Sequence, residues 1–279
     1  MARYTRDFFF SLPLIDDGTS KHIVLPAGDY SDVGSLRRDD LLAPAEDVQL
    51  EVEAGCVFGS QGFWHPACFR GGSQFGEQST FHRWTFFEGK QDVGRFTCFK
   101  EPAEFASAQS FADGILFAEG SKFHSGTIFG DGGSFGGGCK FGAGCAFGDG
   151  NIFGGGCGFG SRSTFGAKNR FGGGCAFHAG CEFGLSCVFL GRSIFSGGCT
   201  FEGGRRPIRD KAPYIFVNGI GSAGEAYFFG FLDGLHIQAR GFHGSENEVM
   251  NKIAKTGGSA YTRDLKLAVE FAKKFFSED

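Results

Sequence analysis

Methionine and tryptophan are scarce in this chain, with two of each among 279 residues, whereas phenylalanine occurs 37 times and glycine 49 times. An ordinary globular core draws on leucine, isoleucine, valine and phenylalanine together. A chain that relies on phenylalanine and glycine instead is predicted to repeat one short structural unit many times. The length is enough for one large or two ordinary domains, with ample room for a core.

Long apolar runs are also missing. No segment has the roughly 20 consecutive apolar residues that a membrane-spanning helix needs. A short apolar run begins at Phe8 and is closed by Asp16 and Asp17, and it lacks the pattern of a signal peptide. We therefore expect a cytoplasmic protein that does not act in a membrane.

No part of the chain carries a strong excess of basic residues. Residues 1–62 have 5 basic and 11 acidic side chains, a net charge of −6, and residues 63–204 have 11 of each. Residues 205–279 have 11 basic and 9 acidic side chains, a net charge of +2. Because nucleic-acid binding requires a concentrated basic surface, we expect no direct binding to nucleic acid. The neutral middle segment also argues against imitation of DNA by negative charge.

A six-residue repeat organises the middle of the chain. Counting in sixes from Phe63 to Phe201 gives 24 positions, of which 23 are phenylalanine and one is Val93, without insertion or deletion. The residue two positions before each of them is usually small. Because residues two apart on a strand face the same side, each hexapeptide is predicted to be a short strand with the small residue and the phenylalanine pointing inward. The predicted core includes Phe123, Phe129, Phe135, Phe141, Phe147, Phe153, Phe159, Phe165, Phe171, Phe177, Phe183, Phe189, Phe195 and Phe201.

Three hexapeptides make one coil of 18 residues, so the repeat predicts a three-sided parallel β-helix of about eight coils, roughly 38 Å long at about 4.8 Å per coil. Identical amides recur at this period, with Gln91 before Gln109 and Asn151 before Asn169. Stacked amides are favoured by parallel strands in register. The residues after each phenylalanine are often Gly-x-Gly, and we expect them to form the corners because glycine tolerates positive φ.

Ten cysteines would suit a disulfide framework in a secreted protein. Seven of them, however, occupy the small position of the hexapeptide, which indicates a packing role. In a reducing compartment they are expected to be free thiols that act as small hydrophobic side chains.

The pattern resembles the hexapeptide-repeat left-handed β-helix family. Phe141-Gly-Ala-Gly-Cys-Ala and Phe171-Gly-Gly-Gly-Cys-Ala follow the order of that repeat, in which an inward residue is followed by Gly, two variable residues, a small residue and one more. The resemblance covers about half of the chain and implies left-handed winding. This sequence departs from the family in its inward residue, which is normally Ile, Leu or Val, and a phenylalanine needs a wider coil or smaller neighbours.

The flanking segments predict a cap at each end of the β-helix. We expect a mainly β fold with an N-terminal cap over residues 1–54, the β-helix over 55–204 and a small C-terminal α+β module over 205–279. Residues 47–54 alternate between apolar and polar side chains, which predicts a half-exposed strand that starts the first coil.

The C-terminal module is predicted to contain a β-hairpin and two helices. Strands are expected over residues 226–232 and 235–240, joined by Asp233-Gly234, a strong hairpin signal. Ser245 with Glu248 makes a capping box for a helix over 246–255. An amphipathic pattern predicts a second helix over 260–276.

One corner of the predicted coil carries a column of carboxylates. Asp113, Asp131 and Asp149 follow one another by 18 residues, so they would stand about 4.8 Å apart on adjacent coils. Like charges at that distance repel, and a calcium ion would relieve the repulsion through carboxylate coordination. The alternative is structural, because each aspartate precedes a glycine and Asp-Gly is a favoured turn pair.

Histidines and lysines on the outer surface provide further candidates. His124 and His178 occupy equivalent corners three coils apart, about 14 Å, so they cannot share a metal ion within one chain. Each is a candidate general base only if a site forms between subunits; the alternative is a solvated imidazole. His82 lies on a different corner. Lys122 and Lys140 stack outward, which suggests either a small anion site or a solvated face.

Within residues 63–201, four aromatic residues fall outside the inward series, namely Trp64, Trp84, Phe86 and Phe96. Outward aromatic side chains on a rod mark a partner surface or lie beneath another part of the chain. We favour the second interpretation here, with the N-terminal cap as the cover.

Three functions are consistent with these patterns. The first is a non-catalytic binding or scaffolding protein whose rigid surface meets a protein partner or a second copy, as a homo-oligomer, because no insertion leaves the rod to build a pocket. The second is an enzyme similar to hexapeptide acyltransferases, with a site between subunits, which the resemblance implies. The third is a phage-encoded inhibitor of a host nucleic-acid-handling or defence system, which only the acidic N-terminal segment supports. The sequence favours the first, and we predict no catalytic residue.

Overall fold

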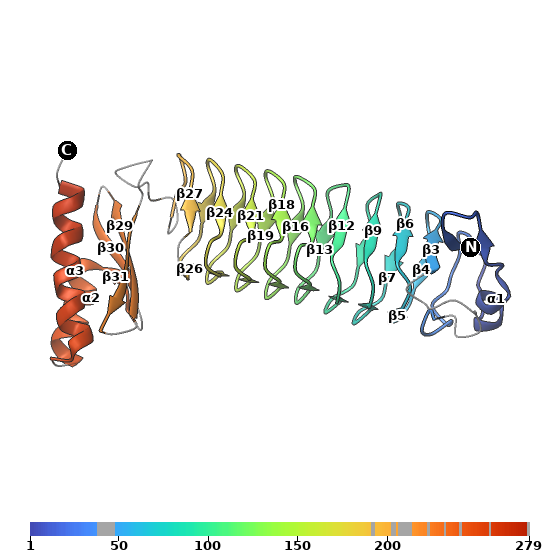
Figure 1. Ribbon diagram of the computed structural model, residues 1–279, viewed down its shortest axis with the longest axis horizontal. Coiled ribbons are helices and arrows are strands. Elements are labelled where there is room, and N and C mark those ends of the chain that lie inside the picture. The colour runs from blue at the N-terminus through green and yellow to red at the C-terminus, as the bar shows by residue number, and fades with distance from the viewer. Residues whose placement is uncertain are drawn as a thin grey trace.

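The computed structural model describes residues 1–37, 48–190, 193–201, 205, 214–221, 224–231, 233–239, 242–256 and 258–277. The chain forms a long rod that ends in a small α+β module (Figure 1). The rod is a parallel β-solenoid of about eight regular coils, and each coil contributes one short strand to each of three sheets. The predicted mainly β, three-sided fold is therefore confirmed.

We call the three sheets of the rod face A, face B and face C. Face A contains β4 (Val57–Phe58), β7 (Gln74–Phe75), β10 (Asp92–Val93), β13 (Ser110–Phe111), β16 (Ile128–Phe129), β19 (Ala146–Phe147), β22 (Thr164–Phe165) and β25 (Glu182–Phe183). Face C contains β5 (Gly62–Phe63), β8 (Thr80–Phe81), β11 (Cys98–Phe99), β14 (Leu116–Phe117), β17 (Ser134–Phe135), β20 (Ile152–Phe153), β23 (Arg170–Phe171) and β26 (Val188–Phe189).

Face B continues farther toward the N-terminus than the other two. It contains β1 (Ile15–Asp16), β2 (Lys21–Leu25), β3 (Val48–Val52), β6 (Ala67–Phe69), β9 (Thr85–Phe87), β12 (Ala103–Phe105), β15 (Lys122–Phe123), β18 (Lys140–Phe141), β21 (Gly158–Phe159), β24 (Ala176–Phe177) and β27 (Ile194–Phe195). On every face, strands pair in parallel with residues 18 positions away, as Phe153 does with Phe135 and with Phe171.

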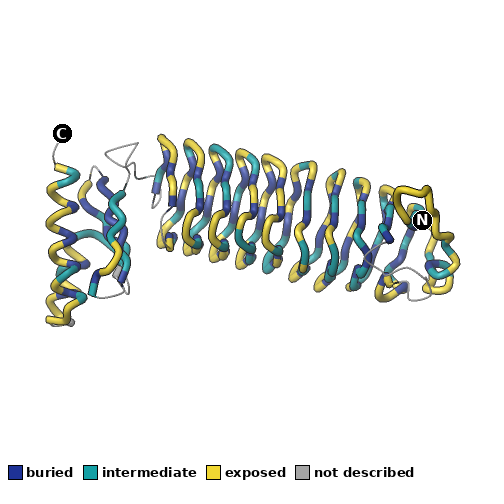
Figure 2. The backbone as a smooth tube through the Cα atoms, viewed as in Figure 1, coloured by how far each residue is buried: buried dark blue, intermediate teal, exposed yellow. Residues whose placement is uncertain are grey.

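Phenylalanine rings fill the lumen of the rod. From Phe123 to Phe201 every member of the series is at most 7% exposed, and Figure 2 shows buried positions recurring along each coil. Within a face the rings stack: the centroid of Phe153 lies 4.8 Å from that of Phe135 and 4.9 Å from that of Phe171, with interplanar angles of 9° and 5°. Rings of different faces meet edge to face, as Phe147 and Phe153 do at 88°. Both arrangements are favoured by the quadrupole of the aromatic ring, so phenylalanine can pack on all three faces of the rod.

The two glycines of a Gly-x-Gly corner are required for different physical reasons. The third corner residue takes the positive φ, as in Gly156 at +72°, so its glycine relieves backbone strain as expected. The first does not: a Cβ on Gly154 would lie 2.5 Å from the backbone nitrogen of Gly137 on the coil below. The first glycine is therefore explained by the close approach of coils and not by its φ angle.

Buried amide ladders run alongside the rings. The Oδ1 atom of Asn169 accepts from the backbone nitrogen of Asn151 at 2.8 Å, and the Oδ1 atom of Asn151 accepts from that of Gly133 at 2.7 Å. The Nδ2 atom of Asn151 donates to two backbone carbonyls at 3.0 and 3.1 Å. Gln109 accepts in the same way from the backbone nitrogen of Gln91 at 2.9 Å. The predicted amide columns are confirmed, and they satisfy corner backbone groups that would otherwise be buried without partners.

The N-terminal segment adds a further, less regular coil to the rod. Strand β2 pairs in parallel with β3, so that Leu25 lies opposite Val52, and Leu36 forms a parallel bridge with Phe63. The short helix α1 (Arg6–Ser11) places Phe9 in the core at the end of the ring column. Strand β1 pairs antiparallel with β2 and ends face B there. Of the strand expected over residues 47–54, β3 covers Val48–Val52, and Asp47 lies outside the described residues.

The C-terminal module is a four-stranded antiparallel sheet with two helices on one side (Figure 1). Its elements are β28 (Tyr214–Ile220), β29 (Gly224–Phe231), β30 (Gly234–Ala239), β31 (Phe242–Ser245), α2 (Glu246–Thr256) and α3 (Ala260–Ser277). The predicted hairpin and both helices are confirmed, as is the capping box, in which the Glu248 carboxylate accepts from the backbone nitrogen of Ser245 at 2.8 Å. Strands β28 and β31 were not predicted from the sequence.

The module closes the rod. Tyr227, Phe229 and Phe231 of β29 join the core of the rod, whereas Ala226 and Phe228 belong to the separate core under the helices. Successive residues of one strand therefore serve two cores, because side chains alternate across a sheet.

Each face of the rod has its own cap for its last ladder edge. The backbone of Arg205 pairs with that of Phe201 next to face A, with N–O distances of 2.7 and 2.8 Å. The hydroxyl of Tyr214 donates to the carbonyl of Ser193 next to face B. The amide of Gln238, oriented to suit its neighbours, accepts from the Phe189 nitrogen at 3.1 Å and donates to the Cys187 carbonyl at 3.3 Å on face C. Such caps remove the open edges that invite strand addition.

Among the described residues, no helix has the length and apolar content needed to cross a membrane.

Candidate interaction surface

The predicted aspartate column exists, and its carboxylates bind backbone groups of the next coil. The Oδ1 atom of Asp113 accepts from the Asp131 nitrogen at 3.0 Å, that of Asp131 from the Asp149 nitrogen at 2.7 Å, and that of Asp149 from the Ala167 nitrogen at 2.7 Å. Arg95 lies 3.8 Å from Asp113 at the lower end. The aspartates therefore have a structural role in bridging two successive corners, which the Asp-Gly turn interpretation did not include. Within the described residues no three Asp, Glu, His or Cys side chains are arranged to hold a metal ion, and a calcium ion here stays a prediction.

The histidines of the rod do not come together. The protonated Nδ1 atom of His124 donates to the Ser125 carbonyl at 2.9 Å, and His178 lies three coils away. His82 stacks on Trp64 with ring centroids 3.7 Å apart. Burial, and then the nearby charges of Lys100 and Arg83, lower the pKa of His82.

The outward lysines form part of an ordinary charged face. Lys122 and Lys140 are in register on face B, and the Nζ atom of Lys122 lies 2.9 Å from a carboxylate oxygen of Glu104. This side chain is therefore already paired with an acid, which favours the solvated-face interpretation over an anion site.

The cysteine column is buried structure. Cys139, Cys157 and Cys175 follow one another on adjacent coils, and the thiol of Cys157 donates to the Gly136 carbonyl at 3.4 Å. None of the ten cysteines, all of which lie in the described residues, forms a disulfide. Cys145 belongs to a neighbouring column, where burial raises the pKa of its thiol, so this thiol stays protonated and unreactive at neutral pH.

The four outward aromatics have different environments. Trp64 carries the guanidinium of Arg37 over its ring at 5.1 Å, so the N-terminal segment contacts it as expected. Trp84 and Phe96 are exposed, which shows that the cap does not cover them. Trp84 stacks beside Phe86, and Phe96 has a positive φ of 56°, which is unusual for a bulky residue. The interpretation of a common cover was wrong because these corners lie along the rod, beyond the reach of its end.

Face C differs from the other two faces in charge. Its outward residues, one before each phenylalanine, are Gly62, Thr80, Cys98, Leu116, Ser134, Ile152, Arg170 and Val188, with one charge among eight. Face A presents Asp92 and Glu182, and face B presents Glu51, Glu104, Lys122 and Lys140.

Apolar side chains are also exposed along face C. Leu116 and Ile152 stand two coils apart, about 10 Å, and Leu185 and Leu190 flank its last strand. The result is a flat, charge-poor strip with projecting aliphatic groups, of the kind that marks contact surfaces on soluble proteins.

This bias was missed in the sequence analysis although the sequence contains its signal. Outward residues that follow one another along the chain lie on different faces, so their order in the sequence mixes residues of all three faces. Reading by steps of 18 separates them and shows that face C is poor in charge.

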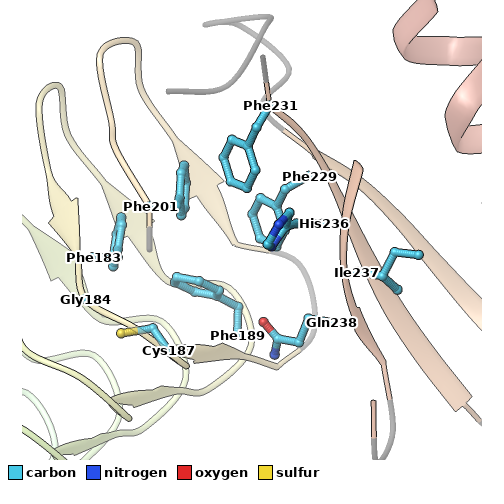
Figure 3. A pocket seen from close by; sticks show the side chains of 10 residues that line it. All are labelled: Phe183, Gly184, Cys187, Phe189, Phe201, Phe229, Phe231, His236, Ile237 and Gln238. Carbon is cyan, nitrogen blue, oxygen red and sulfur yellow. The ribbon is translucent and has the colours of Figure 1, made fainter. Parts of the chain in front are cut away.

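A narrow crevice lies between the last coil and the module. It is lined by Phe183, Gly184, Cys187, Phe189, Phe201, Phe229, Phe231, His236, Ile237 and Gln238 (Figure 3). Its polar groups are already used: Gln238 caps face C, and His236 contacts Arg205, which also pairs with Asp233 at 3.2 Å. We therefore assign the crevice to the seam between rod and cap.

Comparisons with protein-family models, with curated proteins and with solved structures give no match to this chain.

Proposed function

We propose that this protein is a non-catalytic binding or scaffolding protein that presents face C to a protein partner. The observation that carries the proposal is the composition of face C, which bears a single charge along eight coils, against two on face A, and along the same coils exposes both Leu116 and Ile152, against one isoleucine on each of the other faces. Burying such a surface against a partner gains free energy from apolar area and leaves few charges to desolvate.

The construction of the rod supports the same function. Stacked rings, backbone ladders and amide columns hold the coils rigidly, so the surface is formed before any partner arrives. A preformed surface loses little conformational entropy on binding, which favours affinity.

We also infer that the rod has the left-handed winding of the hexapeptide-repeat family and that the protein is cytoplasmic. The order of inward residue, close-packed corner glycine and small residue supports the first inference. Free thiols at all ten cysteines support a reducing compartment.

The test uses two exposed isoleucines on different faces. Ile152 on face C is 51% exposed and Ile128 on face A is 53% exposed, so they form a matched pair. Partners are first captured from the native host with a photo-crosslinking residue placed at Ser134 on face C, or at Ser110 on face A as control. We expect Ile152→Lys to abolish capture and Ile128→Lys to leave it unchanged.

Capture that depends equally on both isoleucines, or crosslinks only from Ser110, would reject face C as the binding surface. Capture of nothing by either probe, together with turnover of an acyl donor by the purified protein, would favour the acyltransferase-like alternative. Crosslinking to a host nuclease would point to the inhibitor alternative.

A further inference from the structure

The outer side of α3 carries an exposed apolar stripe. The inner side packs Leu265, Val269 and Ala272 against the sheet. On the opposite side, Leu267 is 66% exposed and Phe271 is 56% exposed. Residues four apart lie on one side of a helix, so the two form one continuous patch. Figure 1 shows α3 at the extreme end of the molecule, where the rod does not obstruct access.

Charged residues border this patch in an alternating order. Arg263 lies one turn before Leu267; its side chain is 73% exposed and its Nε atom lies 3.3 Å from Oδ1 of Asp264, which leaves the rest of the guanidinium facing solvent. Glu270 lies on the same flank of the stripe, seven residues after Arg263, and is also exposed. Along the helix, the midpoint between Arg263 and Glu270 lies next to Leu267.

We propose that α3 binds the α3 helix of a second copy of this chain, antiparallel, about a two-fold axis beside Leu267. An antiparallel two-fold pair places each residue opposite the one equally far from the axis on the other side. Arg263 of one copy then faces Glu270 of the other, twice. Leu267 packs against Leu267 of the second copy, and Phe271 covers the aliphatic part of Arg263 of the second copy. Lys266 lies on the flank, where its long side chain reaches solvent.

Charge complementarity selects this occupant. A lipid surface would favour a uniformly basic border, and Glu270 interrupts it. The contact involves one helix from each copy, about 27 Å long, and is smaller than standard interfaces, so the dimer should be weak and concentration-dependent. Joined at their C-terminal ends, two rods would point away from each other and present two copies of face C, which would raise the avidity for a repeated partner.

Sedimentation velocity of the full chain over a range of concentrations tests the proposal. We expect a monomer–dimer equilibrium that Leu267→Glu abolishes. Glu270→Arg should weaken the dimer about tenfold, because two attractive pairs become repulsive. The double variant Arg263→Glu with Glu270→Arg should restore it. Ile128→Glu, which changes an exposed isoleucine on the rod, should have no effect. Circular dichroism shows that each variant is folded.

A chain that stays monomeric throughout would overturn the proposal, as would a dimer that Leu267→Glu leaves intact or a double variant that is no tighter than Glu270→Arg. Binding of the monomer to phosphatidylserine vesicles, lost in Leu267→Glu, would assign the patch to a membrane surface instead. These outcomes are independent of face C, because Ile152 and α3 lie on different parts of the molecule.

Discussion

Truncation of one ring in the middle of the rod tests the whole packing scheme. Phe153 is buried and meets six other rings: two stacked at 4.8 and 4.9 Å, and four edge to face between 5.1 and 6.0 Å. Phe153→Ala removes these contacts and leaves a cavity that the hydrogen-bonded coils cannot close. Such substitutions cost about 3–5 kcal/mol of unfolding free energy, and we expect Phe153→Ala to fall in that range.

The preceding residue supplies the control. Ile152 is on the same strand but points to solvent, so Ile152→Ala should change the unfolding free energy by less than about 0.5 kcal/mol. Phe153→Leu keeps most of the apolar area and loses the ring geometry. Ring pairs contribute about 0.5–1.5 kcal/mol each and are not additive around one ring, so we expect a cost of about 1–2 kcal/mol.

Chemical denaturation followed by circular dichroism measures all three variants. The expected order of destabilisation is Phe153→Ala, then Phe153→Leu, then Ile152→Ala. A cost for Phe153→Ala below about 1 kcal/mol, or a cost for Ile152→Ala equal to it, would refute inward rings, because a shift of one residue exchanges the two faces of a strand.

Three further predictions concern the corners, an imidazole and an edge. Lys168 is exposed and has a φ of +60°, so Lys168→Gly should stabilise the fold by about 0.5–1 kcal/mol. Gly156 holds the equivalent position of another corner, and Gly156→Ala should cost about 1 kcal/mol of unfolding free energy. Denaturation midpoints that shift in the same direction for both variants would contradict this prediction. The pKa of His82 is lowered from 6.5, so the unfolded chain binds more protons just below that pH. The stability present above pH 6.5 is therefore lost as the pH falls from there through the lower pKa of the folded state. Denaturation at several pH values should show a shallower decline for His82→Gln, and an equal decline would exclude His82 as a cause. Gln238→Leu should leave the Phe189 nitrogen and the Cys187 carbonyl without hydrogen-bond partners and lower the unfolding free energy by about 1–3 kcal/mol. Light scattering would report any aggregation through the exposed edge of face C. Unchanged stability would mean that the amide does not cap this face.

The interior of the rod was predictable to the level of single side chains. The regular spacing of phenylalanine from Phe63 to Phe201 is a local property, because alternation along a strand and the 18-residue coil do not depend on distant parts of the chain. The amide columns at Gln91 and Asn151 followed from the same spacing. The reason for the first corner glycine did not follow, since the clash at Gly154 involves a backbone nitrogen on the coil below.

The surface was predicted less well because its properties depend on which residues become neighbours. Asp113, Asp131 and Asp149 were placed correctly in one column, but their hydrogen bonds to backbone nitrogens of the next coil could be seen only with the coils in place. Trp84 and Phe96 were expected beneath the cap, and their exposure depends on how far the N-terminal segment reaches along the rod.

By itself, the amino-acid sequence determined the period, the three sides, the inward rings and the helices of the C-terminal module, since each arises from spacing along a few consecutive residues. Only the tertiary structure decided how the rod ends: that residues 21–25 add a strand to face B, that Tyr227, Phe229 and Phe231 close the ring column, and that Arg205, Tyr214 and Gln238 cap the three faces. The physical reason is that an open ladder edge can be satisfied by any suitable donor or acceptor, from a backbone group to a side-chain amide. The packing of the flanking segments, and not the repeat, selects which group that is.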